Sequence, residues 1–269
     1  MTDEPQVIPE FTIITELPGC GASREQLERL YQRYRFASEF CVDKRVLEVA
    51  CGGGVGLGLL AKTAQSVLGG DIDPSNVRIA QKTWHGNPKI SVLEFDTLKM
   101  PFNDSAFDVV LIFEAIYYLQ DVDAFLNECR RVLDKGGVLI IESANKDWKD
   151  FNPSPFSHRY FSVSELYEKL TAHGFSVMMY KSYDDIPESA KTRLLSWIKR
   201  FAVRCGLIPK SMKFKQLFKR IFFGQLVRIP EDISIFSGPY IQPEPMDHGI
   251  RNLQFKVIYA VGKTGGSTS

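Results

Sequence analysis

The chain has 269 residues, 44% of them hydrophobic and 24% charged, which excludes a disordered or fibrous protein and fits one large globular domain or two small ones. Its uninterrupted apolar runs stay well below the roughly 20 residues of a membrane-spanning helix, and its acidic start, Met1–Pro5, differs from a secretory signal. The formal net charge is +1. We therefore expect a cytoplasmic protein.

The first predicted element is a helix over residues 22–40, where apolar side chains recur at helical spacing and Ser23 can act as the N-cap. From Arg45 onward, short apolar runs alternate with amphipathic stretches, which is typical of βαβ units and a parallel sheet covered on both faces. A capping box of Ser162 and Glu165 predicts a later helix. The predicted strands cover residues 45–50, 66–72, 90–95, 107–113, 138–142, 175–181 and 253–261, and the predicted helices end near residue 63 or cover 76–84, 122–133 and 162–173.

These elements predict the α/β class, with a doubly wound, mostly parallel seven-stranded sheet, an N-terminal helix and a helical insertion before the last strand. The five cysteines are scattered and form no C-x-x-C pair, so we expect free thiols and no metal site. The predicted parts are a leader with the first helix (1–43), a core (44–183), a basic helical insertion (184–250), the last core strand (251–263) and a disordered tail (264–269).

The end of the first predicted strand is the most informative stretch for function. Residues 48–56 read Glu-Val-Ala-Cys-Gly-Gly-Gly-Val-Gly and lead directly into a helix. Glycines at this place let the backbone approach a ligand where a Cβ would collide, at the carboxyl edge of a parallel sheet. The second strand ends at Asp71, about 20 residues further on, where a carboxylate can accept hydrogen bonds from ribose hydroxyls. Together they predict a nucleotide-like ligand.

Two common nucleotide sites do not fit this loop. The dinucleotide fingerprint is G-x-G-x-x-G, whereas Gly52, Gly54, Gly56 and Gly58 are spaced by two residues throughout. A Walker phosphate loop is excluded as well, because no Gly-Lys-Ser/Thr sequence follows. The loop therefore predicts neither an NAD site nor a Walker-type ATP site.

The region resembles the class I S-adenosylmethionine-dependent methyltransferases, whose first motif reads acid-x-Gly-x-Gly-x-Gly at this strand end. Glu48, Gly52 and Gly54 match the motif, and Ala50 replaces its first glycine. The other landmarks, in order within residues 44–143, are Asp71, Phe95-Asp96 before residues 98–102, residues 107–110 and residues 128–137. The resemblance implies a Rossmann-like fold, the cofactor S-adenosylmethionine and the product S-adenosylhomocysteine.

The resemblance also implies roles for residues around the cofactor. The glycine loop would receive the methionine part, Asp71 the ribose, Ile72 one face of the adenine and Asp96 its amino group. Tyr34 resembles the lid residues that cover the methionine end in relatives, although a helical tyrosine is also ordinary packing. The implied cofactor-binding set is Tyr34, Glu48, Ala50, Gly52, Gly54, Asp71, Ile72, Asp96 and Phe113.

In this family the acceptor site lies beyond the fourth and fifth strands of the core, and this chain has several catalytic candidates there. His158 is a candidate base for a hydroxyl acceptor, with a loop-anchoring role as the alternative. Glu114 could hold the methionine amino group, orient the acceptor or act as the base, or it is a solvated carboxylate. Tyr117 and Tyr118 either shape the acceptor pocket or belong to the core.

Charge is distributed unevenly along the chain. Eleven of the 33 basic residues and none of the 32 acidic residues lie in residues 191–228, so the remainder is acidic. Two amphipathic arcs in this segment allow three interpretations: a helical pair with a solvated basic face, a peripheral contact with an anionic membrane at its inner face, or a nucleic-acid site. Nucleic acid is the least favoured partner, because the acidic remainder would oppose a polyanion.

The sequence therefore predicts a methyltransferase that acts on a small-molecule acceptor, with a hydroxyl of a sugar, glycan intermediate or secondary metabolite as the favoured target. One alternative is an N- or C-methyltransferase of an amine, a lipid or a quinone. The other is a non-catalytic protein that binds the cofactor, against which the intact Glu48, Asp71 and Asp96 argue.

Overall fold

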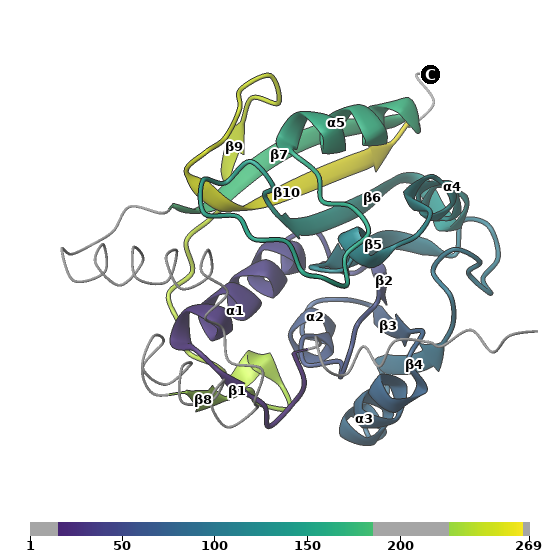
Figure 1. Ribbon diagram of the computed structural model, residues 1–269. Coiled ribbons are helices and arrows are strands. Elements are labelled where there is room, and N and C mark those ends of the chain that lie inside the picture. The colour runs from purple at the N-terminus through teal and green to yellow at the C-terminus, as the bar shows by residue number, and fades with distance from the viewer. Residues whose placement is uncertain (1–15, 185–225, 266–269) are drawn as a thin grey trace, which may run out of the picture.

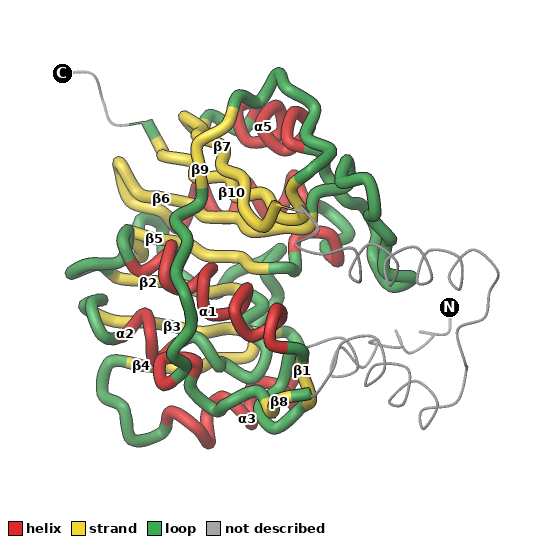
Figure 2. Tube along the Cα trace, turned by 90° about the vertical axis from the view of Figure 1, so that its left-hand side faces the viewer, coloured by secondary structure: helices red, strands yellow, loops and turns green. Residues whose placement is uncertain are grey.

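The computed structural model describes residues 16–184 and 226–265, and these form a central sheet of eight strands with helices on both faces (Figure 1). Figure 2 shows the strands stacked side by side. In spatial order they are β4 (Ile90–Glu94), β3 (Ser66–Asp71), β2 (Arg45–Val49), β5 (Phe107–Phe113), β6 (Leu133–Ala144), β10 (Phe255–Thr264), β7 (Phe175–Asp184) and β9 (Glu244–Met246). The first five run parallel, and β10 runs antiparallel between β6 and β7. The predicted doubly wound, mostly parallel fold is confirmed.

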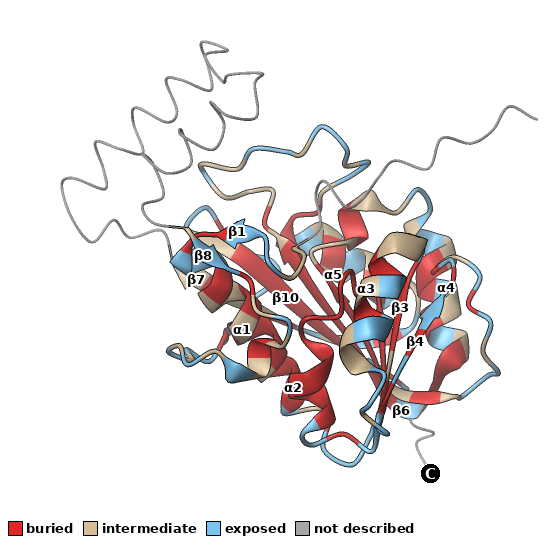
Figure 3. Cartoon of the chain, turned by 90° about the horizontal axis from the view of Figure 1, so that it is seen from below, coloured by how far each residue is buried: buried red, intermediate tan, exposed pale blue. Residues whose placement is uncertain are grey.

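Two groups of helices bury the two faces of the sheet. Successive side chains of a strand point to opposite faces, so Val46 packs into one apolar layer and Leu47 into the other. Burying one such side chain contributes about 1.5–3 kcal/mol, so these layers are the main source of stability. Figure 3 shows the strands buried between the helices. The first layer includes α1 (Arg24–Ser38), α2 (Leu57–Ala61) and α3 (Pro74–Trp84), and the second includes α4 (Val122–Val132) and α5 (Val163–Ala172).

Two helices begin where the sequence predicts. The hydroxyl of Ser23 accepts a hydrogen bond from the backbone N–H of Gln26, whose side chain accepts one from the N–H of Ser23. Ser162 and Glu165 form the same reciprocal pair at the start of α5. Such caps satisfy N–H groups that have no partner inside the helix. The N-cap at Ser23 and the capping box at Ser162 are therefore confirmed.

The structure differs from the prediction in the length of one helix and in the number of strands in the sheet. α2 has only five residues, because the chain from 50 to 56 stays in a loop before it enters the helix. The sheet has one strand more than the predicted seven, the short edge strand β9, which pairs with residues 179–181 of β7. Pro245 lies inside β9. Proline has no N–H to donate to a neighbouring strand, so in sheets it is found mainly in edge strands such as this one. A proline-containing segment of three residues shows no strand periodicity.

The described part of the predicted insertion, residues 226–250, contains β8 (Val227–Arg228), a 3-10 helix, η3 (Ile233–Ile235), and β9. β8 pairs with β1 (Gly21–Ala22), just before α1. The basic stretch 191–225 lies outside the described residues, so all three interpretations, the helical pair with a solvated basic face, the membrane contact and the nucleic-acid site, stay predictions. Among the described helices, none combines the length and hydropathy that crossing a bilayer requires. The four cysteines in the described ranges are free, as predicted.

Candidate functional site

The glycine loop, residues 50–56, joins β2 to α2 at the carboxyl edge of the sheet. Ala50, Gly52 and Gly54 have φ values of 53°, 55° and 70°. A left-handed backbone at a residue with a side chain costs about 1–2 kcal/mol, so the surroundings must hold Ala50 in this conformation. At Gly54, an added Cβ would lie 2.9 Å from the Cβ of Ala80 in α3. The loop therefore depends on glycine for both its turn and its packing.

Asp71, the last residue of β3, holds the glycine loop in place. Its carboxylate accepts hydrogen bonds from the backbone N–H groups of Gly52 at 2.8 Å and Asp73 at 2.9 Å. Asn76 Nδ2 donates a third, at 3.3 Å. Burial raises the pKa of Asp71, and these hydrogen bonds oppose the rise. Asp71, the residue predicted to bind the ribose, thus lies directly beside the loop.

Tyr34 connects α1 to the same loop. Its ring lies against Gly56, where an added Cβ would be 1.9 Å from Cζ of the tyrosine. Its hydroxyl donates a hydrogen bond to Glu48 Oε1 at 2.5 Å. Both side chains are buried, and Oε2 of Glu48 has no partner among the described residues. Leaving a buried acceptor unpaired costs stability, so this oxygen is suited to bind a donor from a ligand.

The remaining predicted cofactor residues lie at the same edge of the sheet. Ile72 follows β3 and is 41% exposed, which provides an apolar surface for a flat ring. Asp96 follows β4, is exposed, and accepts a hydrogen bond from the N–H of Leu98 at 2.9 Å. Phe113 ends β5, is buried, and packs edge-on against Tyr34 with the ring centroids 5.1 Å apart. A buried acid with one oxygen unbonded among the described residues, a tight backbone turn and an apolar surface together fit a nucleoside that carries an amino acid.

Glu114, the residue after β5, is not a solvated carboxylate. Its φ is 48°, in the left-handed region. Oε1 accepts a hydrogen bond from Nη2 of Arg29 at 2.6 Å, and Oε2 accepts one from the hydroxyl of Tyr117 at 2.9 Å. Because both oxygens have protein partners, the geometry favours an orienting role over the role of a base.

Tyr117 and Tyr118 lie in a short 3-10 helix, η2 (Ile116–Tyr118), and both contact the second apolar layer, while their role in an acceptor pocket stays a prediction. Tyr117 is buried in the second apolar layer and stacks on Tyr160 with the centroids 4.2 Å apart. Tyr118 is half-buried and meets the ring of Tyr117 edge-on at 4.6 Å. Tyr117 is thus a core residue whose hydroxyl reaches Glu114, while Tyr118 keeps one side open to solvent.

His158 lies in the loop between β6 and α5, and its side chain is exposed. Its backbone N–H donates a hydrogen bond to the carbonyl of Tyr117 at 2.8 Å, and the N–H of Arg159 approaches the same oxygen at 3.3 Å. The loop is therefore fastened to the residues that follow β5. The backbone does the anchoring, which leaves the imidazole available for chemistry.

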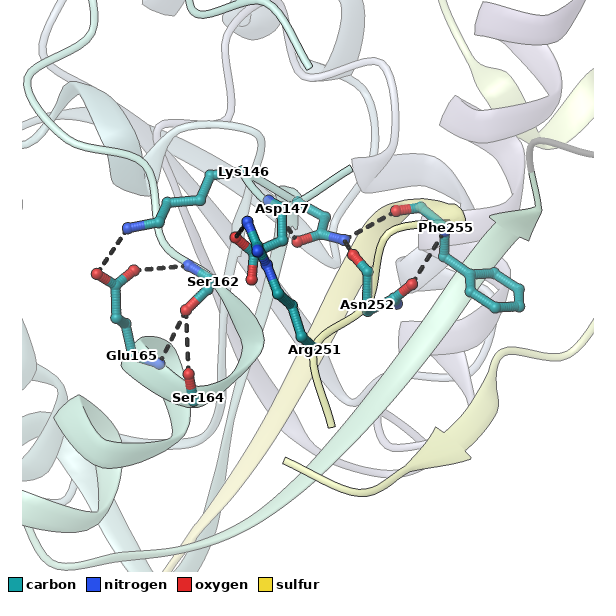
Figure 4. A network of polar contacts seen from close by, with 9 residues as sticks. Lys146, Asp147, Ser162, Ser164, Glu165, Arg251, Asn252 and Phe255 are labelled. Atoms are coloured by element: carbon teal, nitrogen blue, oxygen red, sulfur yellow. Dashed lines mark hydrogen bonds and ion pairs between the residues drawn. The ribbon is translucent and has the colours of Figure 1, made fainter. Parts of the chain in front are cut away.

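A polar network holds the two ends of this loop (Figure 4). At its start, Nδ2 of Asn145 donates to the carbonyls of Asn252 at 2.8 Å and Phe255 at 3.0 Å, which ties β6 to the start of β10. Lys146 pairs with Glu165, in the first turn of α5, at 2.6 Å. With both ends fixed, the position of the loop over the sheet edge is set by the core.

The structure also places a buried acid that the sequence patterns did not single out. Glu142 lies near the end of β6, exposes 1% of its surface, and is 3.8 Å from Nη1 of Arg33 in α1. The available signal was a carboxylate that directly follows the apolar run 138–141. Its pairing with a residue more than 100 positions away could not be seen in the sequence.

Comparison with known proteins agrees with this geometry. Residues 47–141 match a family described as Methyltransferase domain. Over 184 residues the chain is 30% identical to a probable S-adenosylmethionine-dependent methyltransferase of Mycolicibacterium smegmatis, in an alignment that covers 66% of this chain and 70% of the relative. The chain belongs to the class I S-adenosylmethionine-dependent methyltransferases. The predicted family and its cofactor, S-adenosylmethionine, are thereby confirmed.

Two further proteins resemble this methyltransferase over different spans. It is 30% identical over 109 residues to the ubiquinone biosynthesis O-methyltransferase of a Bradyrhizobium species, which covers 40% of this chain and 42% of the relative. The solved structure of the YcgJ protein of Bacillus subtilis matches with a TM-score of 0.58 at 18% identity, over 91% of this chain and 100% of that chain. At that identity the likeness concerns the fold alone, and it supports the Rossmann-like architecture.

Replacing Glu48 by glutamine should change how stability depends on pH. Burial raises the pKa of Glu48 from 4.5 to about 7, although the Tyr34 hydrogen bond and Arg33 oppose the rise. The folded chain then binds this proton more tightly than the unfolded chain, so stability falls as the pH rises from 4.5 to 7. Since glutamine does not titrate, the melting temperature of Glu48→Gln should rise relative to that of the wild type as the pH increases through this window.

The control is Glu94→Gln, at an exposed position of β4. Its melting temperature should stay at a constant offset from the wild type between the same pH values. Parallel curves for Glu48→Gln and the wild type would contradict the burial of an ionisable Glu48.

Proposed function

We propose that this methyltransferase transfers its methyl group to a hydroxyl of a small-molecule acceptor, such as a sugar, a glycan intermediate or a secondary metabolite. The observation that carries the proposal is the hydrogen bond from the N–H of His158 to the carbonyl of Tyr117, which fastens the backbone of this exposed histidine to the residues that follow β5. A hydroxyl must lose its proton as it attacks, and a neutral imidazole can accept it near neutral pH. The relative named as an O-methyltransferase supports the same reaction class.

In this proposal the carboxyl ends of β2, β3 and β4 hold the cofactor. The glycine loop and Glu48 receive the methionine part, and Asp71 accepts hydrogen bonds from the ribose hydroxyls. Ile72 and Asp96 take the adenine. The full binding set is Tyr34, Glu48, Ala50, Gly52, Gly54, Asp71, Ile72, Asp96 and Phe113, of which Tyr34 and Phe113 exclude water from the reacting centre.

The bound cofactor supplies a methyl group that is already activated by its positively charged sulfur, so the protein needs no nucleophile of its own. Its task is to hold an acceptor oxygen in line with the sulfur–methyl bond. The imidazole of His158 would take the proton that the acceptor hydroxyl gives up when it is methylated. Glu114 orients the acceptor, because Arg29 and Tyr117 hold its carboxylate in one position, and Tyr118 borders the acceptor on its solvent side.

The methylated product tests the proposed reaction. Incubation with S-adenosylmethionine carrying a labelled methyl group and fractionated small-molecule extracts should label a compound, and mass spectrometry with NMR should place the label on oxygen. A label on nitrogen or carbon would contradict the proposal in favour of the N- or C-methyltransferase alternative. Cofactor binding without a labelled product from any fraction would favour a non-catalytic protein.

With that acceptor in hand, His158→Ala should lower kcat by about a hundredfold, because the hydroxyl loses its base. Its affinity for S-adenosylhomocysteine and its melting temperature should stay close to those of the wild type, since the anchoring hydrogen bond comes from the backbone. His85→Ala, at an exposed residue that caps α3, is the matched control and should keep full activity. Full activity in a folded His158→Ala variant would contradict the role of His158.

A further inference from the structure

Glu142 lies under α1 as a buried acid that has no hydrogen-bond partner within residues 16–184 and 226–265. Neither of its carboxylate oxygens is bonded within the described residues. Nη1 of Arg33 is 3.8 Å from Oε2, a distance at which charges attract but no hydrogen bond forms. Burying an unbonded acid opposes folding. The two unbonded oxygens of Glu142 are therefore better suited to bind a polar group of a ligand than to stabilise the fold.

The two arginines near Glu142 form their hydrogen-bonded ion pairs with other acids. Arg29 is bonded to Glu114 at 2.6 Å and Arg33 to Glu16 at 2.5 Å, so each guanidinium already has a carboxylate of its own. Burial raises the pKa of Glu142 to about 8, an effect to which Glu114 adds and which Arg33 opposes. The raised pKa favours the protonated form of the carboxyl group, which can both donate and accept a hydrogen bond.

Other buried polar atoms next to Glu142 also lack partners. Tyr259 is directly opposite it on β10, is fully buried, and has an unbonded hydroxyl within the described residues. The Nε atoms of Arg29 and Arg33 are buried and unbonded as well. These four residues are the Glu142 cluster: Glu142, Tyr259, Arg29 and Arg33.

The buried atoms of the Glu142 cluster that lack hydrogen-bond partners among the described residues determine which ligand group can bind there. They include donors, the two Nε atoms, as well as an acceptor, the carbonyl oxygen of the Glu142 carboxyl group. An ammonium group only donates hydrogen bonds, and a carboxylate or phosphate only accepts them, whereas a hydroxyl does both. A hydroxyl is therefore the simplest group that satisfies both kinds of atom at once.

The Glu142 cluster borders the proposed acceptor site. Glu142 is the register partner of Phe113 on β5, and its carbonyl accepts a hydrogen bond from the N–H of Glu114 at 2.9 Å. The ring centroid of Tyr183 lies 5.9 Å from Cζ of Arg29, so an aromatic side chain also belongs to the surroundings of the cluster. Glu16, the ion-pair partner of Arg33, is 35% exposed.

We propose that the Glu142 cluster binds a hydroxyl-bearing ring of the methyl acceptor. The inference rests on the proposed function and names the acceptor class more narrowly, as a ring with neighbouring hydroxyls. One hydroxyl binds to Glu142 and Tyr259, and the other is the reacting group that His158 deprotonates. Binding residues on β6 and β10 thereby join those at the ends of β2 to β5.

The binding test uses isothermal titration calorimetry on the full chain saturated with S-adenosylhomocysteine, which has no methyl group to transfer. The probes are catechol and methyl α-glucoside, a flat ring and a sugar ring that each carry neighbouring hydroxyls, with benzylamine and benzoate as charged controls. We expect at least one hydroxylated probe to bind in the millimolar range, and neither charged control to bind measurably. Binding by a charged control alone, or by none of the four, would overturn the inference.

Two substitutions separate ligand binding from a structural role. Glu142→Met keeps the length of the side chain but removes its hydrogen-bonding atoms, so it should weaken binding of the hydroxylated probe by about tenfold or more. Glu142→Gln, which retains a donor and an acceptor, should recover most of that binding. Because Glu142→Met removes an unbonded buried acid, its melting temperature should match or exceed that of the wild type.

The matched control is Glu128→Met, since the carboxylate of Glu128 accepts hydrogen bonds from the N–H of Met100 at 2.7 Å and from Arg131 at 2.8 Å. It should lower the melting temperature and leave probe binding unchanged. An equal loss of stability in Glu142→Met, or unchanged probe binding, would overturn the inference. No turnover occurs in this titration, so its failure is distinguishable from a product methylated on nitrogen or carbon, which would contradict the proposed function.

Discussion

The hydrogen bonds from Gly52 and Asp73 to the buried carboxylate of Asp71 are the constraint on which the rest of the site depends. They join the loop after β2 to the end of β3, and so set the path of the backbone where the proposed cofactor site begins. In that path the carbonyl of Gly54 accepts a hydrogen bond from Trp84 Nε1 at 2.8 Å, and Gly56 lies under the ring of Tyr34. A side chain at either glycine would push away the element that closes the loop.

One helix serves both halves of the site. Tyr34 of α1 reaches Glu48 beside the glycine loop, while Arg29 and Arg33 reach the acids near the ends of β5 and β6. Arg29 and Arg33 are four residues apart and therefore lie on one face of the helix. In our account this shared helix holds the cofactor and the acceptor in a fixed relation, which is what an in-line methyl transfer requires of the protein.

The sequence predicts well what depends on neighbouring residues. The caps at Ser23 and Ser162, the alternation of strands and helices, and the glycine loop are local signals, and the structure confirms them. The sequence could not predict contacts between residues that are far apart along the chain, such as the ion pair of Glu114 with Arg29. The strand β9 was missed for a different reason, because Pro245 suppresses the local signal of a strand that only an existing sheet edge can pair.

The most direct test of the account is the affinity of Asp71→Ala for S-adenosylhomocysteine, measured by isothermal titration calorimetry beside Asp104→Ala, an exposed acid paired with Arg131. If the ribose is bound at the end of β3, Asp71→Ala should lose about 1.5–3 kcal/mol of binding free energy, because charge-assisted hydrogen bonds disappear. Asp104→Ala should bind as the wild type does. Unchanged affinity in a folded Asp71→Ala variant would contradict the placement of the cofactor at the glycine loop.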